Sequence, residues 1–97
     1  MQILFFTKEK AKVEEIVKND DLVSRQSLTI RSADSLDINE KFSDGYFFLI
    51  EGSEGAISKA KELLKDIAEV VENGEKIIQK IKEEEEKAME GFGNILG

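Results

Sequence analysis

Two groups of residues in this 97-residue chain have the types and spacing that could bind a small anion. The first is the turn Gly52-Ser53-Glu54-Gly55, which separates an apolar run from an amphipathic stretch. Free N–H groups at a helix start, together with the helix dipole, favour phosphate at such a turn. Glu54 opposes this because it adds a negative charge, and the spacing does not match a P-loop. We therefore favour a capped structural turn and keep Gly52, Ser53 and Gly55 as candidate ligand-binding residues.

The second group is basic and consists of Lys8, Lys10, Arg25 and Arg31. Lysines in the first turn of a helix are unexpected because the helix dipole opposes a positive charge there. An anion pocket between the end of the first predicted strand and the second strand would explain their presence. An exposed helix face, on which the lysines pair with neighbouring glutamates, is the simpler interpretation. We favour the exposed face and keep the four residues as candidates for an anion site.

Acidic residues are dense between Asp34 and Asp44, and carboxylates in such a segment can bind Ca²⁺ or Mg²⁺. An EF-hand loop that starts at Asp37 fails, because Lys41 takes the fifth position and Phe42 takes the position of the glycine. A solvated polar loop is the simpler interpretation. We predict no metal site and no cofactor.

The chain contains no cysteine and no histidine. The missing cysteine removes disulfides and thiol nucleophiles, and the missing histidine removes the commonest general base. Together these absences exclude Cys/His zinc sites, Ser-His-Asp and Cys-His catalysis, and His-ligated haem. No nucleophile comes with an evident activator, so we predict no catalytic residue, and an enzyme is the least supported class of protein.

The net charge of −7 comes from 21 acidic and 14 basic residues spread along the chain. A diffuse negative field disfavours nucleic acid and anionic membranes as partners. No apolar run approaches the roughly 20 residues of a membrane helix, and the start lacks the basic region of a signal peptide. We expect a cytoplasmic protein. Its abundant lysine and glutamate without cysteine are typical of heat-adapted proteins.

The first half of the chain predicts a strand, a helix and a second strand. Residues 3–6 form an apolar run of the buried-strand type, and Thr7 can cap a helix over residues 8–19. Residues 25–32 alternate between polar and apolar side chains, which predicts a half-buried strand at a sheet edge. Residues 33–45 are predicted as a long loop, or as an irregular hairpin, whose Leu36, Ile38 and Phe42 dip into the core.

The second half predicts a buried strand and two helices. Tyr46–Ile50 is apolar throughout, which is typical of a strand covered on both faces. Ser53 is the expected N-cap of a helix that continues to Val71, since apolar residues recur at helical spacing as far as that residue. A last helix is expected from Glu75, carrying a charged run and Ala88 and Met89, followed by the glycine-rich apolar tail 91–97.

The order strand-helix-strand-strand-helix resembles the ferredoxin-like split βαβ arrangement, with a C-terminal helix in place of, or beyond, the fourth strand. The sequence thus predicts one α+β domain over residues 1–97. Its two-layer core covers about residues 1–71, and the C-terminal helix and apolar tail cover about residues 75–97. If the fourth strand were absent, the first strand would be an edge open to pairing with another chain.

Both faces of the predicted central strands are apolar, so we expect something to cover the face that two helices leave open. The last helix could fold over that face, or a second subunit could. The candidate oligomer-interface residues are Ile3, Phe5, Phe92, Ile95 and Leu96. The favoured function is a non-catalytic homo-oligomeric module in a regulatory or protein-interaction role, whose partner is itself or another protein. The alternative is a domain that binds a small ligand or anion.

Overall fold

A computed structural model describes residues 1–36, 42 and 44–84 of the chain, which form an α+β protein. Its elements in chain order are β1 (Gln2–Thr7), α1 (Lys10–Asn19), the short 3₁₀ helix η1 (Val23–Arg25), β2 (Ser27–Ser32), α2 (Ala33–Leu36), β3 (Tyr46–Glu51), α3 (Glu54–Leu64) and β4 (Glu69–Val70). A further helix spans residues 75–84. Within these described residues, no helix is both long enough and apolar enough to cross a lipid bilayer.

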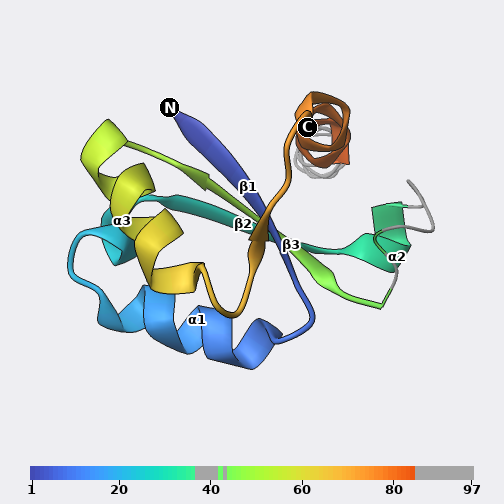
Figure 1. The fold of residues 1–97 in the computed structure, drawn as a ribbon. Coiled ribbons are helices and arrows are strands. Elements are labelled where there is room, and N and C mark those ends of the chain that lie inside the picture. Colours follow the sequence, from blue (N-terminus) through green and yellow to red (C-terminus); the bar gives the residue numbers. More distant parts are fainter. Residues whose placement is uncertain (37–41, 43, 85–97) are drawn as a thin grey trace, which may run out of the picture.

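The four strands form one antiparallel sheet in the order β2-β3-β1-β4 (Figure 1). β1 and β3 pair along their whole length, from Gln2 opposite Glu51 to Thr7 opposite Tyr46. β4 is much shorter and lies only opposite Phe5 and Phe6. β2 is therefore one edge of the sheet, as its alternating pattern predicted. The other edge is formed by β4 beside one half of β1 and by β1 itself along the other half.

The first face of the sheet is covered by α1 and α3. Phe5, Phe48 and Ile50 point to this side and pack against Val13 of α1 and Leu64 of α3. The side chains of Phe5, Phe48 and Leu64 have no exposed surface. Burying each large apolar side chain contributes about 1.5–3 kcal/mol, so this cluster supplies much of the stability of so small a domain.

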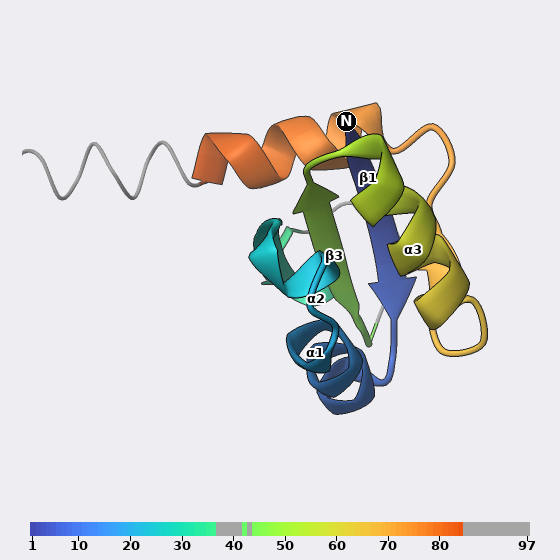
Figure 2. The same ribbon diagram turned by 90° about the vertical axis from the view of Figure 1, so that its left-hand side faces the viewer.

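The second face is covered by the 75–84 helix, on the opposite side of the sheet from α1 and α3 (Figures 1 and 2). Ile77 and Ile81 of this helix pack on Leu4, Phe47 and Leu49 of the central strands. The sequence predicted that something must cover this face, and a helix of the same chain does so. The helix lies beyond a short fourth strand rather than in place of it.

Two ion pairs connect the 75–84 helix with strands of the sheet. The Lys82 Nζ lies 2.8 Å from the Glu51 Oε1 at the end of β3. The Arg31 Nε on β2 lies 3.8 Å from the Glu84 Oε2. Exposed pairs of this kind contribute about 0–1 kcal/mol each, so apolar packing holds the helix and the ion pairs fix its direction across the sheet.

The α3 helix ends at Leu64, and the prediction that it continues to Val71 is wrong. The Thr7 hydroxyl donates to the carbonyl of Ile67 at 2.6 Å, and Val71 N–H donates to the carbonyl of Leu4 at 2.9 Å. These bonds fix residues 67–71 beside β1, where Ile67 still contacts the first core and Val71 contacts the second. Ile67 and Val71 thus have the spacing of a helix face, but they pack on opposite faces of the sheet.

Other element boundaries differ by a few residues from the sequence predictions. α1 begins at Lys10 rather than residue 8, and its N-cap is Glu9, so the prediction that Thr7 caps the helix is wrong. The Thr7 hydroxyl instead accepts from Glu9 N–H. β2 begins at Ser27 rather than residue 25 because η1 occupies the preceding turn. The predicted loop contains the single turn α2, and Phe42 contacts the second core as expected. Ile38, Ala88 and Met89 lie outside the described residues.

Asp20 joins α1, η1 and α3. Its Oδ2 accepts from Leu22 N–H at 3.1 Å and Val23 N–H at 2.8 Å, and its Oδ1 lies 2.8 Å from the Lys59 Nζ of α3. The hydrogen bond from Lys59, followed by the backbone bond from Val23, holds the pKa of the Asp20 carboxyl below its usual value. The same contact raises the pKa of the Lys59 ammonium.

We expect Asp20 to make folding sensitive to acid. A carboxyl with a lowered folded-state pKa stabilises the fold above its unfolded value of 3.8, and that contribution is lost as the pH falls through the folded value. Urea unfolding of wild type and Asp20→Asn should therefore differ most near pH 7, and the difference should shrink below about pH 4. Asp66→Asn, on the exposed surface after α3, is the matched control. A difference between wild type and Asp20→Asn that is constant with pH would contradict this role.

Candidate protein-interaction site

The basic residues that the sequence proposed for an anion site lie apart. Lys8 and Lys10 follow the end of β1, which pairs with the start of β3. Arg25 precedes the start of β2, which pairs with the end of β3. The lysines and Arg25 are thus at opposite ends of six-residue strands, a length of about 17–20 Å.

Arg31 and Lys10 lie on different faces of the sheet. Arg31 stands opposite Phe47, whose side chain belongs to the second core, and it faces Glu84. The Lys10 Nζ lies 5.0 Å above the ring of Tyr46, which packs on the first core, and 3.6 Å from the Glu14 carboxylate. No common pocket gathers these four cations.

The Gly52–Gly55 turn uses its N–H groups within the chain. Gly52 N–H donates to the carbonyl of Met1 at 2.9 Å, and Ser53 N–H donates to the Gln26 Oε1 at 3.4 Å. The Ser53 hydroxyl accepts from Ala56 N–H at 3.2 Å, which confirms it as the N-cap of α3. A Cβ at Gly55 would meet nothing within 4 Å, so no close approach requires a glycine there. The contacts are those of a capped turn.

The remaining sequence candidates divide between the core and the undescribed tail. Ile3 and Phe5 are 6% and 0% exposed, so the chain itself already covers them. Phe92, Ile95 and Leu96 lie outside the described residues. In the acidic segment, Asp44 N–H donates to the Asp34 Oδ1 at 3.3 Å. Across the described ranges, no three carboxylates come together in a way that could hold a metal ion.

The sequence named the first strand as an edge open to pairing if a fourth strand were absent, whereas the structure has a short fourth strand, β4, that leaves half of β1 open (Figure 1). Met1 exchanges backbone hydrogen bonds with Gly52, so Met1 and alternate residues after it direct their backbone groups toward β3. Gln2 therefore directs its N–H and C=O to the outer side of the sheet. Leu4, on the same side, has its carbonyl bonded to Val71 N–H. In the described part of the chain, nothing bonds to the backbone groups of Gln2.

The turn after β4 explains why this half stays open. Asn73 has a positive φ of 56°, a left-handed conformation that asparagine tolerates better than most residues. Gly74 passes so close to β1 that a Cβ there would lie 2.9 Å from the Leu4 Cδ2. The chain thus turns away from the sheet after two paired residues and begins the 75–84 helix on the second face.

A hollow of about 370 Å³, which we call the edge groove, follows the open half of β1. One wall comes from Ile57 and Lys61 of α3, and the other from Glu75 and Ile78 of the 75–84 helix. Met1 and Val70 also line it and keep 70% and 43% of their surface exposed. The edge groove therefore combines unpaired backbone groups with uncovered apolar surface.

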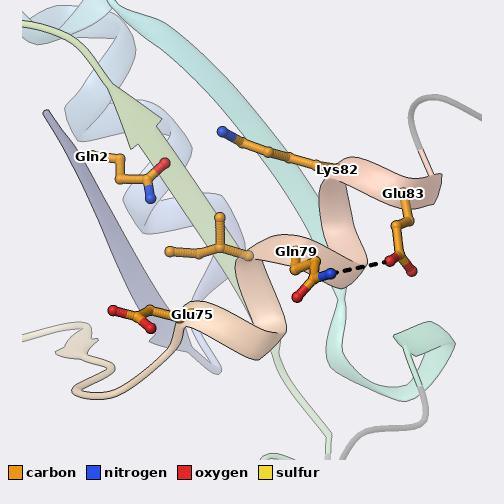
Figure 3. Close-up of a pocket in the computed structure, with 6 residues that line it drawn as sticks. Gln2, Glu75, Gln79, Lys82 and Glu83 are labelled. Carbon is orange, nitrogen blue, oxygen red and sulfur yellow. Dashed lines mark hydrogen bonds between the residues drawn. The ribbon is translucent and has the colours of Figure 1, made fainter.

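A second hollow of about 430 Å³ adjoins the edge groove, because Gln2, Glu75 and Ile78 line both. In Figure 3, Gln2 of β1 lies across this hollow from Gln79 and Lys82 of the 75–84 helix. Gln79 donates to the Glu83 Oε1 at 3.5 Å on the same helix. The hollow is lined mainly by polar side chains and forms a rim to the edge groove.

The edge groove has the properties of a site for strand addition. In that mode an extended segment pairs its backbone with a sheet edge, and its alternate side chains enter flanking pockets. The open half of β1 supplies the backbone groups, and α3 and the 75–84 helix supply the two walls.

No protein-family model matches the chain, and neither a curated protein nor a solved structure matches it.

Proposed function

We propose that this chain is a non-catalytic protein-interaction module that associates with another chain through the open half of β1. We further propose that its architecture is the ferredoxin-like split βαβ arrangement with an added C-terminal helix. The strand order β2-β3-β1-β4, with α1 and α3 on one face, supports this architecture. On the basis of the sequence, the proposal includes a cytoplasmic location, association of the chain with itself and a regulatory role.

The observation that carries the proposal is the pair of outward backbone groups at Gln2. A strand edge with free N–H and C=O groups is a ready template for another strand, and proteins commonly protect such edges. Here neither a long neighbouring strand nor a proline protects it, and apolar Met1 and Val70 stand beside it. A small anion as ligand has less support, because the basic residues that would bind it lie apart.

Gln2→Pro is expected to weaken association. Proline removes the outward N–H of Gln2, while the β1–β3 ladder does not use that group and proline is tolerated at a strand's first residue. A hydrogen bond contributes about 0.5–1.5 kcal/mol, so we expect the association constant to fall about 3–10-fold. Sedimentation velocity over a concentration series would measure it, against the 10.9 kDa monomer.

Gln2→Ala is the matched control, because it removes the same side chain and keeps the N–H. It should associate like wild type, and both variants should keep the wild-type unfolding midpoint. A wild-type protein that stays monomeric at all concentrations and binds no extended peptide would overturn the proposal. Equal association by Gln2→Pro and wild type would show that the open half of β1 is not the interface.

A further inference from the structure

We infer that the occupant of the edge groove is the tail segment 91–97 of a second copy of this chain. The inference rests on the proposed function, because it names the partner that the open half of β1 would pair with. The occupant adds a strand beside Gln2, and its apolar side chains enter the space between α3 and the 75–84 helix.

The tail shares one sequence property with the central strands of the sheet, which is a stretch without charged side chains. Three stretches of the chain run for six or more residues without a charged side chain, and they are residues 1–7, 45–50 and 91–97. The first two contain almost all of β1 and β3, the central strands. The third is the one uncharged stretch of this length that lies outside the described residues.

The edge groove fits an uncharged segment with apolar residues on both sides. Polar and apolar surface line it in nearly equal parts, and its charged residues Lys61 and Glu75 are opposite in sign. Neighbouring residues of a strand point to opposite faces, so Ile95 and Leu96 would direct one side chain to each wall. Ile78 on the 75–84 helix and Val70 of β4 keep exposed apolar surface that these side chains would contact, whereas Ile57 on α3 is only 3% exposed.

The last described residue of the chain lies at the opposite edge of the sheet from the edge groove. The 75–84 helix begins at the edge groove, where Glu75 and Ile78 line it. Its last described residue, Glu84, lies beside Arg31 on β2, the opposite edge strand. The ten described residues of this helix span about 15 Å, which separates Glu84 from the groove of the same chain. A tail that comes from a second copy does not have to span this distance.

The test uses the full-length chain with Ile95→Ser and Leu96→Ser combined. We expect its association constant, measured by sedimentation velocity, to fall at least tenfold. Glu90→Gln, just before the uncharged stretch, is the control and should associate like wild type. A labelled peptide of residues 88–97 should bind the Ile95→Ser/Leu96→Ser chain, and adding Gln2→Pro to that chain should weaken this binding 3-fold or more.

The outcomes separate this inference from the proposed function. If the tail variant associates like wild type while Gln2→Pro does not, the tail is not the occupant and the proposed function stands. If the tail variant fails to associate but Gln2→Pro associates normally, the tail binds elsewhere and the inference is wrong. If the wild-type chain is monomeric and hydrogen exchange shows the tail amides protected, the chain fills its own groove and the second copy is excluded.

Discussion

Replacing Phe47 by alanine is expected to lower the free energy of unfolding by about 3–5 kcal/mol. Phe47 has no exposed surface and lies in the centre of the second core. Its ring centroid is 5.5 Å from that of Phe6 and 5.3 Å from that of Phe42. The substitution removes the ring that these two contact and leaves a cavity between β3 and the 75–84 helix. Urea unfolding followed by circular dichroism would measure the loss.

This loss is large because the total free energy of unfolding of a domain of this length is about 5–15 kcal/mol. Phe47→Ala should therefore leave a clearly reduced unfolding midpoint, and partly unfolded protein at physiological temperature. Val70→Ala is the control, since Val70 is 43% exposed and its truncation should change stability by about 0.5 kcal/mol or less. A loss below about 1.5 kcal/mol for Phe47→Ala would mean that the second face is less tightly covered than its burial indicates.

The parts of the fold that could be predicted are those that local sequence determines. Tyr46–Ile50 is apolar at every position, which requires cover on both faces wherever the strand lies. The Ser53 side chain caps α3 through a bond three residues away. Each of these signals acts within a few residues of the chain, so periodicity and capping rules are sufficient to find them.

The end of α3 could not be predicted because distant residues determine it. Ile67 and Val71 fit the helical spacing, but Thr7 and Leu4, some 60 residues earlier, bind the backbone around them. The hydrogen bonds to Thr7 and Leu4 hold this segment beside β1 and outside the helix. Pairing between segments far apart in the sequence leaves no local pattern, and apolar spacing alone cannot distinguish one helix face from two sheet faces.

The sequence named the first strand as a possible open edge, but the extent of the open half of β1 could not be predicted, for a related reason. The edge groove exists because β4 stops after two residues and the chain turns at Asn73 and Gly74. The sequence indicates that a secondary-structure element ends at these residues, but it does not indicate which residue of β1 lies beside that end. The candidate anion site does not form because the fold separates its residues. Lys8 and Lys10 lie at the opposite strand end from Arg25, and Arg31 lies on the other face of the sheet from Lys10.

Ile81→Asp is expected to release the 75–84 helix from the second face. Ile81 has no exposed surface, and an ionised carboxylate at its position would face Leu4, Phe47 and other apolar side chains without a partner. The helix can avoid that cost by detaching, so the loss is limited to its own packing. Two buried isoleucines at about 1.5–3 kcal/mol each set this limit at about 3–6 kcal/mol.

Hydrogen exchange would distinguish detachment from global unfolding. Amides of the 75–84 helix should exchange rapidly in Ile81→Asp, while those of α3 and β3 keep part of their protection because the first core does not include this helix. A dye that binds exposed apolar surface should bind the variant. Gln79→Asp adds the same charge on the exposed side of the same helix and should change stability by about 0.5 kcal/mol or less.

Detachment of this helix has a further consequence for association. Glu75 and Ile78 form one wall of the edge groove, so a released helix would leave the open half of β1 without that wall. Ile81→Asp should therefore lose the specific association that Gln2→Pro weakens, and gain concentration-dependent aggregation through the uncovered second face. If Ile81→Asp kept wild-type association and slow exchange in the helix, Ile81 would not be the residue that anchors it to the sheet.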